Sequence, residues 1–349
     1  MGSLLLWLQL AGMALAILVA SKYLVRSADI IAVETGMGRS FVGVLLLATA
    51  TSLPELATGV SSIMLVGEPD LAAGDAFGSN IFNLLIIGIL DLTWKNGPIL
   101  GSVGKDSLLV AFSGVVIIGV ATLAILFYWL GIFAINTYVS PMSVLLLFVF
   151  FLIMYMIFQS DKHNGETLLK EGEQPARPGS SELFNASFLY ICSAGVMVLA
   201  SVFLARTGDS IAIAMEWHAS FVGTQFLAFS TSLPELATSF AAVRIGAPEL
   251  AISNVLGSNI FNMGFVLFMD ELAYTDGPIW SGISHIHLFT GVIAILMTLV
   301  VSIGILSNLR KQSRYASTSV SNISRTWPLE SIALIMLYII SSILIFNLS

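Results

Sequence analysis

Long apolar runs separated by short polar breaks follow one another along the whole sequence. Most are close to the roughly 20 residues that a helix needs to cross a bilayer, and the breaks carry Lys, Arg, Gly or Pro. No basic residue precedes the first run, unlike in a cleavable signal, so we expect it to be retained as a helix. Ten membrane-spanning helices are predicted, at residues 4–24, 40–66, 71–94, 107–128, 140–158, 186–205, 220–244, 248–272, 285–306 and 329–348.

The composition agrees with a chain embedded in lipid. Apolar residues make up 57% of the chain and charged residues only 10%, against about 25% charged residues in soluble domains. The net charge of −7 argues against a nucleic-acid-binding protein, and the single cysteine argues against a disulfide scaffold. We expect an all-α polytopic membrane protein that is not an enzyme, since no nucleophile–base pair or metal motif of an intramembrane hydrolase is present.

The basic residues predict the orientation of this arrangement. With ten helices, every one of the 14 Lys and Arg residues except Arg206 falls on the side that the chain reaches after the first helix. The positive-inside rule assigns that side to the cytoplasm. We therefore expect a plasma-membrane protein with both termini outside and the long polar loop at residues 159–185 in the cytoplasm.

The sequence contains an internal repeat. Residues 41–63 match residues 221–243 at an offset of 180, and GSNIFN at 78–83 recurs at 257–262 at an offset of 179. Further along, GPI at 97–99 recurs at 277–279, and Asp91 pairs with Asp270. Each half holds five predicted helices, an odd number, so the second half begins on the opposite side of the membrane. We predict two inverted five-helix repeats, residues 1–158 and 186–349, joined by a flexible linker at 159–185.

Two glutamates lie at equivalent places in the repeated SLPELAT segment, in the middle of predicted helices. Placing a charged group there costs about 2.5–3.5 kcal/mol by insertion scales, so such groups face a cavity or a partner. The proline before each glutamate frees a backbone carbonyl that a cation can use. The glutamates are Glu55 and Glu235, and the hydroxyl residues one turn earlier on the same faces are Thr51, Ser52, Thr231 and Ser232.

The third and eighth helices carry a matching polar stripe. In each helix three polar residues are spaced by four, and a glycine within the stripe permits close approach of a second backbone. Asp75 differs from its repeat partner, the neutral Asn254, and could be a ligand, a proton carrier or a packing group. The stripes are Asp75, Ser79 and Asn83 with Gly78, and Asn254, Ser258 and Asn262 with Gly257.

All of these side chains offer oxygen. No His or Cys belongs to the repeats, which disfavours zinc, copper or iron, whereas a hard ion such as Ca²⁺ takes 6–8 oxygens. Two glutamates balance one Ca²⁺, two Na⁺ or two protons, and a site that is costly to leave empty favours exchange over leak. A passive cation channel could use the same carboxylates and is the alternative.

The segments TSLPELATG…GSNIFN and TSLPELATS…GSNIFN resemble the two alpha repeats of the cation/calcium antiporter superfamily, the sodium/calcium exchanger group. The resemblance spans essentially the whole chain. It implies a cofactor-free secondary antiporter that exchanges Ca²⁺ for Na⁺ by alternating access, with the first and sixth helices sliding past the others. The ion ligands that it implies are Glu55, Glu235, Thr51, Thr231, Ser52, Ser232, Ser79, Ser258 and the carbonyls of Ala48 and Ala228, with Asn83 and Asn262 alongside. We expect the chain to act as a monomer in the lipid bilayer.

Two departures from the family pattern, and a comparison with its H⁺-coupled branch, bear on the ions. Ala50 and Ser230 stand where the family often has Gly before the TS pair. Both GSNIFN motifs end in Asn, where many members, including the K⁺-dependent branch, carry Asp, so we do not expect K⁺ co-transport. The H⁺-coupled branch usually shows a different glutamate motif. Na⁺ coupling is therefore favoured, and an H⁺-coupled antiporter of Ca²⁺ or another divalent cation is the alternative.

Overall fold

The computed structural model describes residues 2–34, 49–95, 97–132, 137–168, 180–315 and 329–348, and within these ranges all regular structure is helical. The longer helices are α1 (Gly2–Glu34), α3 (Leu53–Ser61), α4 (Pro69–Thr93), α5 (Lys105–Trp129), α6 (Pro141–Leu168), α7 (Ser180–Met215), α10 (Leu233–Arg244), α11 (Pro248–Phe261), α12 (Leu267–Ala273), α14 (His287–Tyr315) and α15 (Leu329–Leu348). The short pieces are η1 (Ser62–Val66), η2 (Ile99–Gly101), α8 (Ala219–Val222), η3 (Gly223–Leu227), α9 (Ala228–Thr231), η4 (Asn262–Val266) and α13 (Ile279–Gly282).

Most of the predicted membrane spans are present as helices. Among the described residues, eight helical segments are long and apolar enough to cross a bilayer, and the bent pair Ala219–Thr231 and Leu233–Arg244 makes a ninth. The remaining predicted span, 40–66, is described only in its second part, the apolar helix Leu53–Val66. Large apolar side chains such as those of Leu8 and Phe148 are exposed along the spans, as a lipid-facing surface requires. The chain is an all-α polytopic membrane protein, and the count of ten spans stays a prediction.

Several helices extend well beyond their apolar runs. α6 continues to Leu168 and α7 begins at Ser180, so residues 159–168 and 180–185 of the predicted linker are helical. Residues 169–179 lie outside the described ranges. The apolar run reports the thickness of the hydrocarbon layer, whereas the helix continues wherever its backbone hydrogen bonds are kept.

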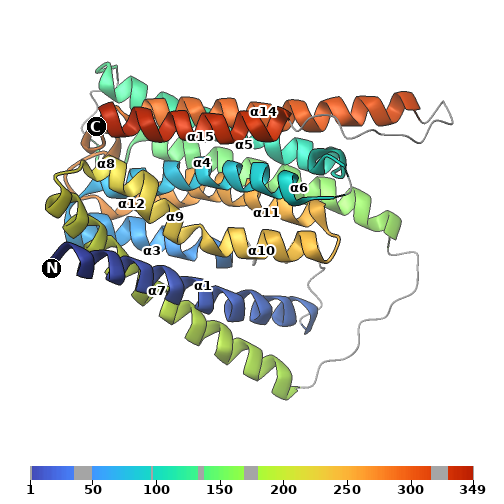
Figure 1. The fold of residues 1–349 in the computed structure, drawn as a ribbon, viewed down its shortest axis with the longest axis horizontal. Coiled ribbons are helices and arrows are strands. Elements are labelled where there is room, and N and C mark those ends of the chain that lie inside the picture. Colours follow the sequence, from blue (N-terminus) through green and yellow to red (C-terminus); the bar gives the residue numbers. More distant parts are fainter. Residues whose placement is uncertain are drawn as a thin grey trace.

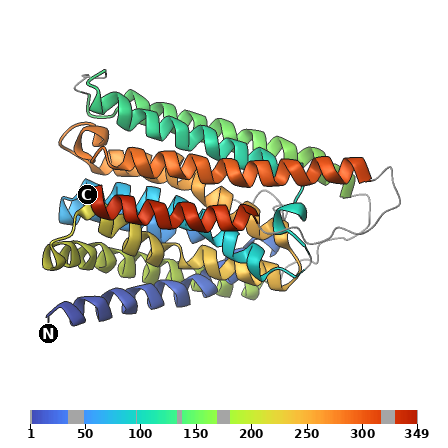
Figure 2. The same cartoon turned by 45° about the horizontal axis from the view of Figure 1, so that its top comes forward.

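The helices are arranged in layers around two central ones. In the most apolar windows of α4 and of the α11–α12 segment, 78% of the residues are buried, against 28% for α1 and 22% for α15. α1 packs along α7 at one edge of the bundle, and α5, α6, α14 and α15 cover the other side (Figures 1 and 2). The main apolar core excludes α1 and α7, which meet the other helices through two smaller apolar clusters.

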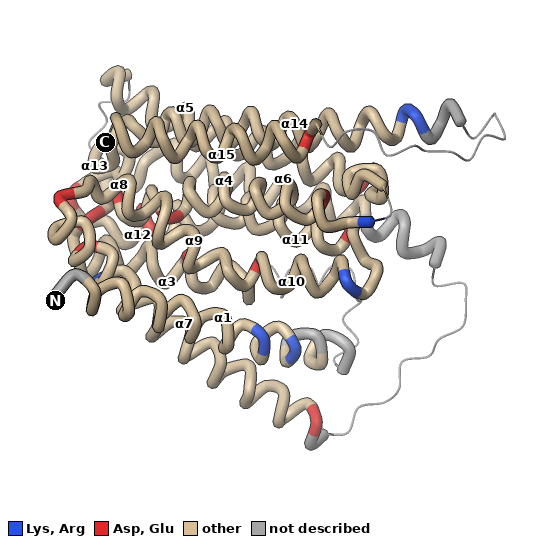
Figure 3. Tube along the Cα trace, viewed as in Figure 1, with Lys and Arg blue, Asp and Glu red and all other residues tan. Residues whose placement is uncertain are grey.

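The two described chain ends lie at the same end of the bundle (Figure 1), as an even number of spans requires. Most described Lys and Arg residues gather at the opposite end (Figure 3). The sequence predicts this separation of charge from the termini.

Two turns of π-helix explain why the offset between the repeats changes. A π-helical turn corresponds to one residue inserted into an α-helix. From Leu53 to Gly67 the first repeat has one residue more than the second, and η1 lies in that interval. Beyond GSNIFN the second repeat has one residue more, and η4 lies there while α4 stays regular. The offset therefore changes from 180 to 179 and back to 180.

The second insertion corrects one pairing between the repeats. Asp91 accepts the backbone N–H of Ile99 at 2.6 Å, and Glu271 accepts the N–H of Ile279 at 3.0 Å. Glu271, and not Asp270, is thus the counterpart of Asp91, and both cap the loop that contains GPI. Asp270 falls opposite Leu90, a residue of the apolar core.

Candidate cation-binding site

Each SLPE segment interrupts its helix just before the glutamate. Ser52 and Ser232 leave the α-helical conformation, with φ and ψ of −89° and 8° and of −84° and 8°, and the second helix bends by 43° there. The break places Glu55 in the first turn of α3 and Glu235 in the first turn of α10. The N-termini of these half-helices, with their free backbone N–H groups, favour a negative charge. Both glutamates are fully buried.

Hydroxyl groups from the opposite repeat surround each glutamate. Ser232 donates to Glu55 Oε1 at 3.1 Å, and Thr231 also hydrogen-bonds this carboxylate. Thr51 of the first repeat hydrogen-bonds Glu235. The serine of each GSN motif completes the set from the same repeat, Ser79 on Glu55 and Ser258 on Glu235 at 3.1 Å.

The contacts obey an approximate two-fold symmetry. The hydroxyls of Thr51 and Ser258 lie 3.4 Å apart, and so do those of their counterparts Thr231 and Ser79. The charges of the two glutamates are close enough to interact. The structure thus brings together, at the point where the repeats meet, two half-sites: the first is Glu55 with its surrounding hydroxyls and the second is Glu235 with its own.

The centre of the symmetry is a pair of asparagines that the sequence analysis missed. Asn80 donates to the backbone carbonyl of Asn259 at 3.4 Å, and Asn259 donates to that of Asn80 at 3.2 Å. Asn83 donates to the Asn259 side chain at 2.9 Å. Both asparagines are the third residue of GSNIFN, and their identity in the two repeats was the sequence signal that could have identified them. We interpret this pair as the link between α4 and α11, since its amides bond to each other's backbone.

Several buried oxygens of the cluster accept no hydrogen bond. These are the Oε2 atoms of Glu55 and Glu235, the Ser52 hydroxyl and the side-chain oxygens of Asn83 and Asn262. Leaving such groups without a partner costs several kcal/mol when they are charged, so the cluster suits a cation. Among the described residues, no three His, Cys, Asp or Glu side chains are grouped to hold a metal ion by themselves. Hydroxyl and carbonyl oxygens must therefore supply most of the coordination.

Asp75 belongs to the cluster, and its repeat partner does not. Thr231 donates to Asp75 Oδ1 at 2.9 Å, so Asp75 lies beside the hydroxyls of the first half-site. Asn254, in α11, instead donates to Thr238 of α10 at 3.0 Å, within its own repeat.

Of the two predicted alanine carbonyls, only that of Ala228 lies in the part of the chain that the structure describes. The Ala228 carbonyl already accepts the Ser232 amide at 3.1 Å. The carbonyl that the proline leaves without its helical donor is that of Ser230, four residues before Pro234. Ala48 lies outside the described residues.

Glycines bring α4 close to the broken helix. A Cβ atom on Gly78 would lie 2.5 Å from the Thr224 carbonyl oxygen, and one on Gly223 would lie 2.7 Å from that of Leu71. The predicted close approach is confirmed at Gly78. At Gly257 no described atom lies within 4 Å of the Cβ position.

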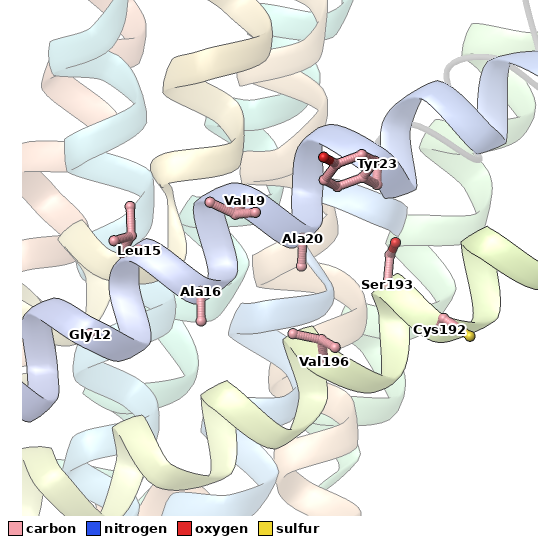
Figure 4. A pocket seen from close by; sticks show the side chains of 9 residues that line it. All are labelled: Gly12, Leu15, Ala16, Val19, Ala20, Tyr23, Cys192, Ser193 and Val196. Carbon is pink, nitrogen blue, oxygen red and sulfur yellow. The ribbon is translucent and has the colours of Figure 1, made fainter.

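Away from the cluster, an apolar groove of about 510 Å³ lies between α1 and α7 (Figure 4). Its lining includes Leu15, Val19, Val196 and the thiol-bearing Cys192, and no charged residue. A groove of this kind suits a lipid chain and not an ion.

At the end of the bundle that holds the termini, Glu68 lies in the short turn before α4. Partial burial, with the nearby negative charges of Asp209 and Asp70, raises the pKa of its carboxyl group. The acids at this end together favour cations over anions.

Comparison with known proteins agrees with this arrangement. The family described as sodium/calcium exchanger protein matches residues 5–159 and 186–347. The chain is 28% identical over 295 residues to the inner membrane protein YrbG of Escherichia coli K12, covering 78% of this chain and 80% of YrbG. It is 26% identical over 290 residues to the sodium/calcium exchanger MaX1 of Methanosarcina acetivorans, covering 73% and 79%.

A solved structure shares the fold. The sodium-calcium exchanger NCX_Mj, soaked with Na⁺ and Sr²⁺, superposes with a TM-score of 0.59 at 20% identity, covering 97% of this chain and 98% of the other. The family match covers both halves of the chain, and the fold is similar to that of this exchanger. The chain belongs to the sodium/calcium exchanger protein family.

Proposed function

We propose that the protein is a secondary active antiporter that exchanges Ca²⁺ for Na⁺ across the membrane. One observation supports this above all: Glu55 and Glu235 are fully buried, their charges are close enough to interact, and one oxygen of each has no partner. Two such charges balance one Ca²⁺ or two Na⁺. The relative MaX1, named as a sodium/calcium exchanger, supports the same choice of ions.

The proposed ligands are the oxygens of the cluster. The carboxylates supply the charge, and the hydroxyls supply neutral donors that hard cations accept. In this proposal the full set is Glu55, Glu235, Thr51, Thr231, Ser52, Ser232, Ser79, Ser258, Asn83, Asn262 and the carbonyls of Ala48 and Ala228, with Asp75 as an additional ligand.

Exchange follows from the cost of emptying the site. Reorienting the empty site from one side of the membrane to the other is costly in free energy, because two buried, charged glutamates would then have neither a cation nor solvent to balance them. The loaded site is cheaper to reorient, so one ion must replace the other. A passive channel would not need this replacement.

Alternating access is proposed to use α1 and α7. These helices pack chiefly on each other, and separate apolar clusters join them to the helices that carry the site. Such a pair can slide as a unit without opening the main core. The groove in Figure 4 lies between these two helices.

The proposed setting is the plasma membrane, with the monomer as the working unit. The end of the bundle rich in Lys and Arg faces the cytoplasm by the positive-inside rule, which places both termini outside and the central loop in the cytoplasm. Figure 3 supports this separation of basic residues from the termini.

The test is ⁴⁵Ca²⁺ uptake into vesicles that contain the purified protein. Vesicles loaded with Na⁺ are expected to take up Ca²⁺, whereas vesicles loaded with K⁺ or given an outward H⁺ gradient are not. Glu55→Gln and Glu235→Gln are expected to abolish uptake, and Glu182→Gln, at an exposed position at the start of α7, should not. Uptake that needs no counter-ion would refute exchange, and full activity of both glutamine variants would refute the site.

A further inference from the structure

Asp270 is a buried acid with no place in the repeat. It is fully buried in α12, and neither carboxylate oxygen has a hydrogen-bond partner. Its counterpart in the first repeat is Leu90, because η4 shifts the register by one residue. An ionisable residue within a membrane span marks an ion or proton pathway by default. Its unpaired oxygens show that it is not a structural cap like its neighbour Glu271.

The carboxylate of Asp270 lies against α3. A Cβ atom on Gly59 would be 2.5 Å from Asp270 Oδ1 and 2.8 Å from Oδ2. The second repeat has Ser239 at this place, so the glycine makes room for the acid. Glu55 precedes Gly59 by four residues and Ser62 follows it by three, which puts all three on one face of the helix. The acid therefore lies on the helix face that leads away from the central glutamate.

More oxygens without partners follow the same face. The hydroxyls of Thr58 and Ser62 are buried and form no hydrogen bond. Ser62 replaces the alanine that the second repeat has at 242. Gly59, Ser62 and Asp270 each differ from their counterparts in the other repeat. Ser62 and Asp270 add oxygen atoms and Gly59 leaves space for them, so the extra oxygens lie only on this side of the central glutamates.

Asp75 connects this group to the central site. Its charge interacts with those of Glu55 and Asp270, and its Oδ2 atom has no hydrogen-bond partner. Asp75 is again a departure from the repeat, since the second repeat has a neutral asparagine there. The charges of these acids interact in the order Glu235, Glu55, Asp75 and Asp270. The last of them belongs to α12, a helix that lies toward the end of the bundle that holds the termini (Figure 1).

We propose that Asp270, Asp75, Thr58 and Ser62 form a second cation site for Na⁺, beside the central glutamates on the side of the chain termini. The oxygens without partners number five, two from Asp270 and one from each other residue. Ca²⁺ takes 6–8 oxygens, so the group is too small for it and suits a monovalent hard ion. The repeat has no equivalent site on the opposite side, so Na⁺ is held outside the central pair on one side only.

The choice of Na⁺ rests on the proposed exchange, whereas the site itself can be tested without transport. The purified protein is heated in detergent with NaCl replacing choline chloride at constant ionic strength. Asp270→Leu, which restores the residue of the first repeat, and Asp270→Asn should each lose at least half of the Na⁺-dependent rise in Tm. The Ca²⁺-dependent rise should stay the same. Asp276→Asn, at an exposed position six residues further on, is the matched control.

Sided transport gives the second readout. In vesicles of known orientation, the Na⁺ concentration that gives half-maximal Ca²⁺ flux should rise about tenfold for Asp270→Leu when Na⁺ is presented on the termini side. It should change less than twofold from the other side. An unchanged Na⁺ dependence of Tm, or equal shifts on both sides, would overturn the proposal. Absence of Na⁺-driven flux in the unaltered protein would refute the exchange instead, and the Tm measurement would still decide the site.

Discussion

The close approach of α4 to the bent helix pair at residues 219–244 allows a quantitative prediction. In Gly78→Ala the added Cβ atom would lie 2.5 Å from the Thr224 carbonyl oxygen and 2.6 Å from Thr224 Cα. Optimal contacts between carbon atoms are about 3.5–4.0 Å, so the two backbones must separate by about 1 Å. No side-chain rotamer can relieve the overlap, because the atoms that it meets are backbone atoms of Thr224 and the Cβ atom of Ala228, which has no rotamers.

The expected cost follows from this geometry. Overpacking costs about 1–3 kcal/mol, and a backbone overlap belongs at the upper end. Replacing glycine by alanine within a helix returns up to about 1 kcal/mol. We therefore expect Gly78→Ala to destabilise the protein by about 2 kcal/mol. The separation also lengthens the contacts of Thr231 with Asp75 and Ser79, now 2.9 Å and 3.4 Å, so Ca²⁺ uptake should fall at least tenfold.

The control is Gly119→Ala in α5, where no described atom lies within 4 Å of the Cβ position. In this variant alanine brings the same gain in helix propensity without an overlap. The Tm of the variant should therefore stay equal or rise, and its Ca²⁺ uptake should be unchanged. Thermal unfolding in detergent and ⁴⁵Ca²⁺ uptake measure the two effects. If both variants behave alike, close packing of α4 on the broken helix does not hold the site together.

Three further predictions concern single contacts. Ser232→Ala removes a hydrogen-bond donor from Glu55 and should lower the apparent Ca²⁺ affinity about tenfold. The Ser230 hydroxyl bonds to the Phe226 carbonyl at 2.7 Å, within the same helical segment, so Ser230→Ala should leave the affinity unchanged. Equal effects of the two variants would contradict the contact between Ser232 and Glu55. Glu271→Gln removes one of the two acceptors that hold backbone amides at 2.5 Å and 3.0 Å and should cost about 2 kcal/mol in chemical unfolding, and an unchanged midpoint would exclude a capping role. Asn80→Ala and Asn259→Ala should show a coupling energy of about 1 kcal/mol in a double-mutant cycle of Tm values, and strict additivity would mean that the reciprocal bonds contribute nothing.

Much of the fold could be predicted because hydropathy reports directly on the bilayer. Nine predicted spans correspond to helices, and the SLPELAT and GSNIFN motifs come together as their repetition implies. The length of α6 could not be predicted this way, because hydropathy falls at Gln159 while the helix goes on to Leu168. Hydrophobic periodicity measures contact with lipid or core, and not the persistence of backbone hydrogen bonds.

The inserted residues show a signal that was present and misread. The change of offset from 180 to 179 and back is visible in the sequence, but its structural form, a π-helical turn, depends on packing between helices. Pairing Asp91 with Asp270 assumed that the shorter offset continued past GSNIFN. The loop caps at Asp91 and Glu271 correct the alignment, and only then does Asp270 emerge as an acid without a counterpart.

The way the half-sites are assembled has a consequence for the proposed transport cycle. Glu55 is held by the hydroxyls of Thr231 and Ser232 from the second repeat, and Glu235 by that of Thr51 from the first. Neither repeat can therefore build a complete half-site alone. A movement that separates the repeats removes donors from both carboxylates at once, and this is tolerable only while a cation or proton balances them. The same contacts that define the ion site thus link its occupancy to the relative position of the two repeats.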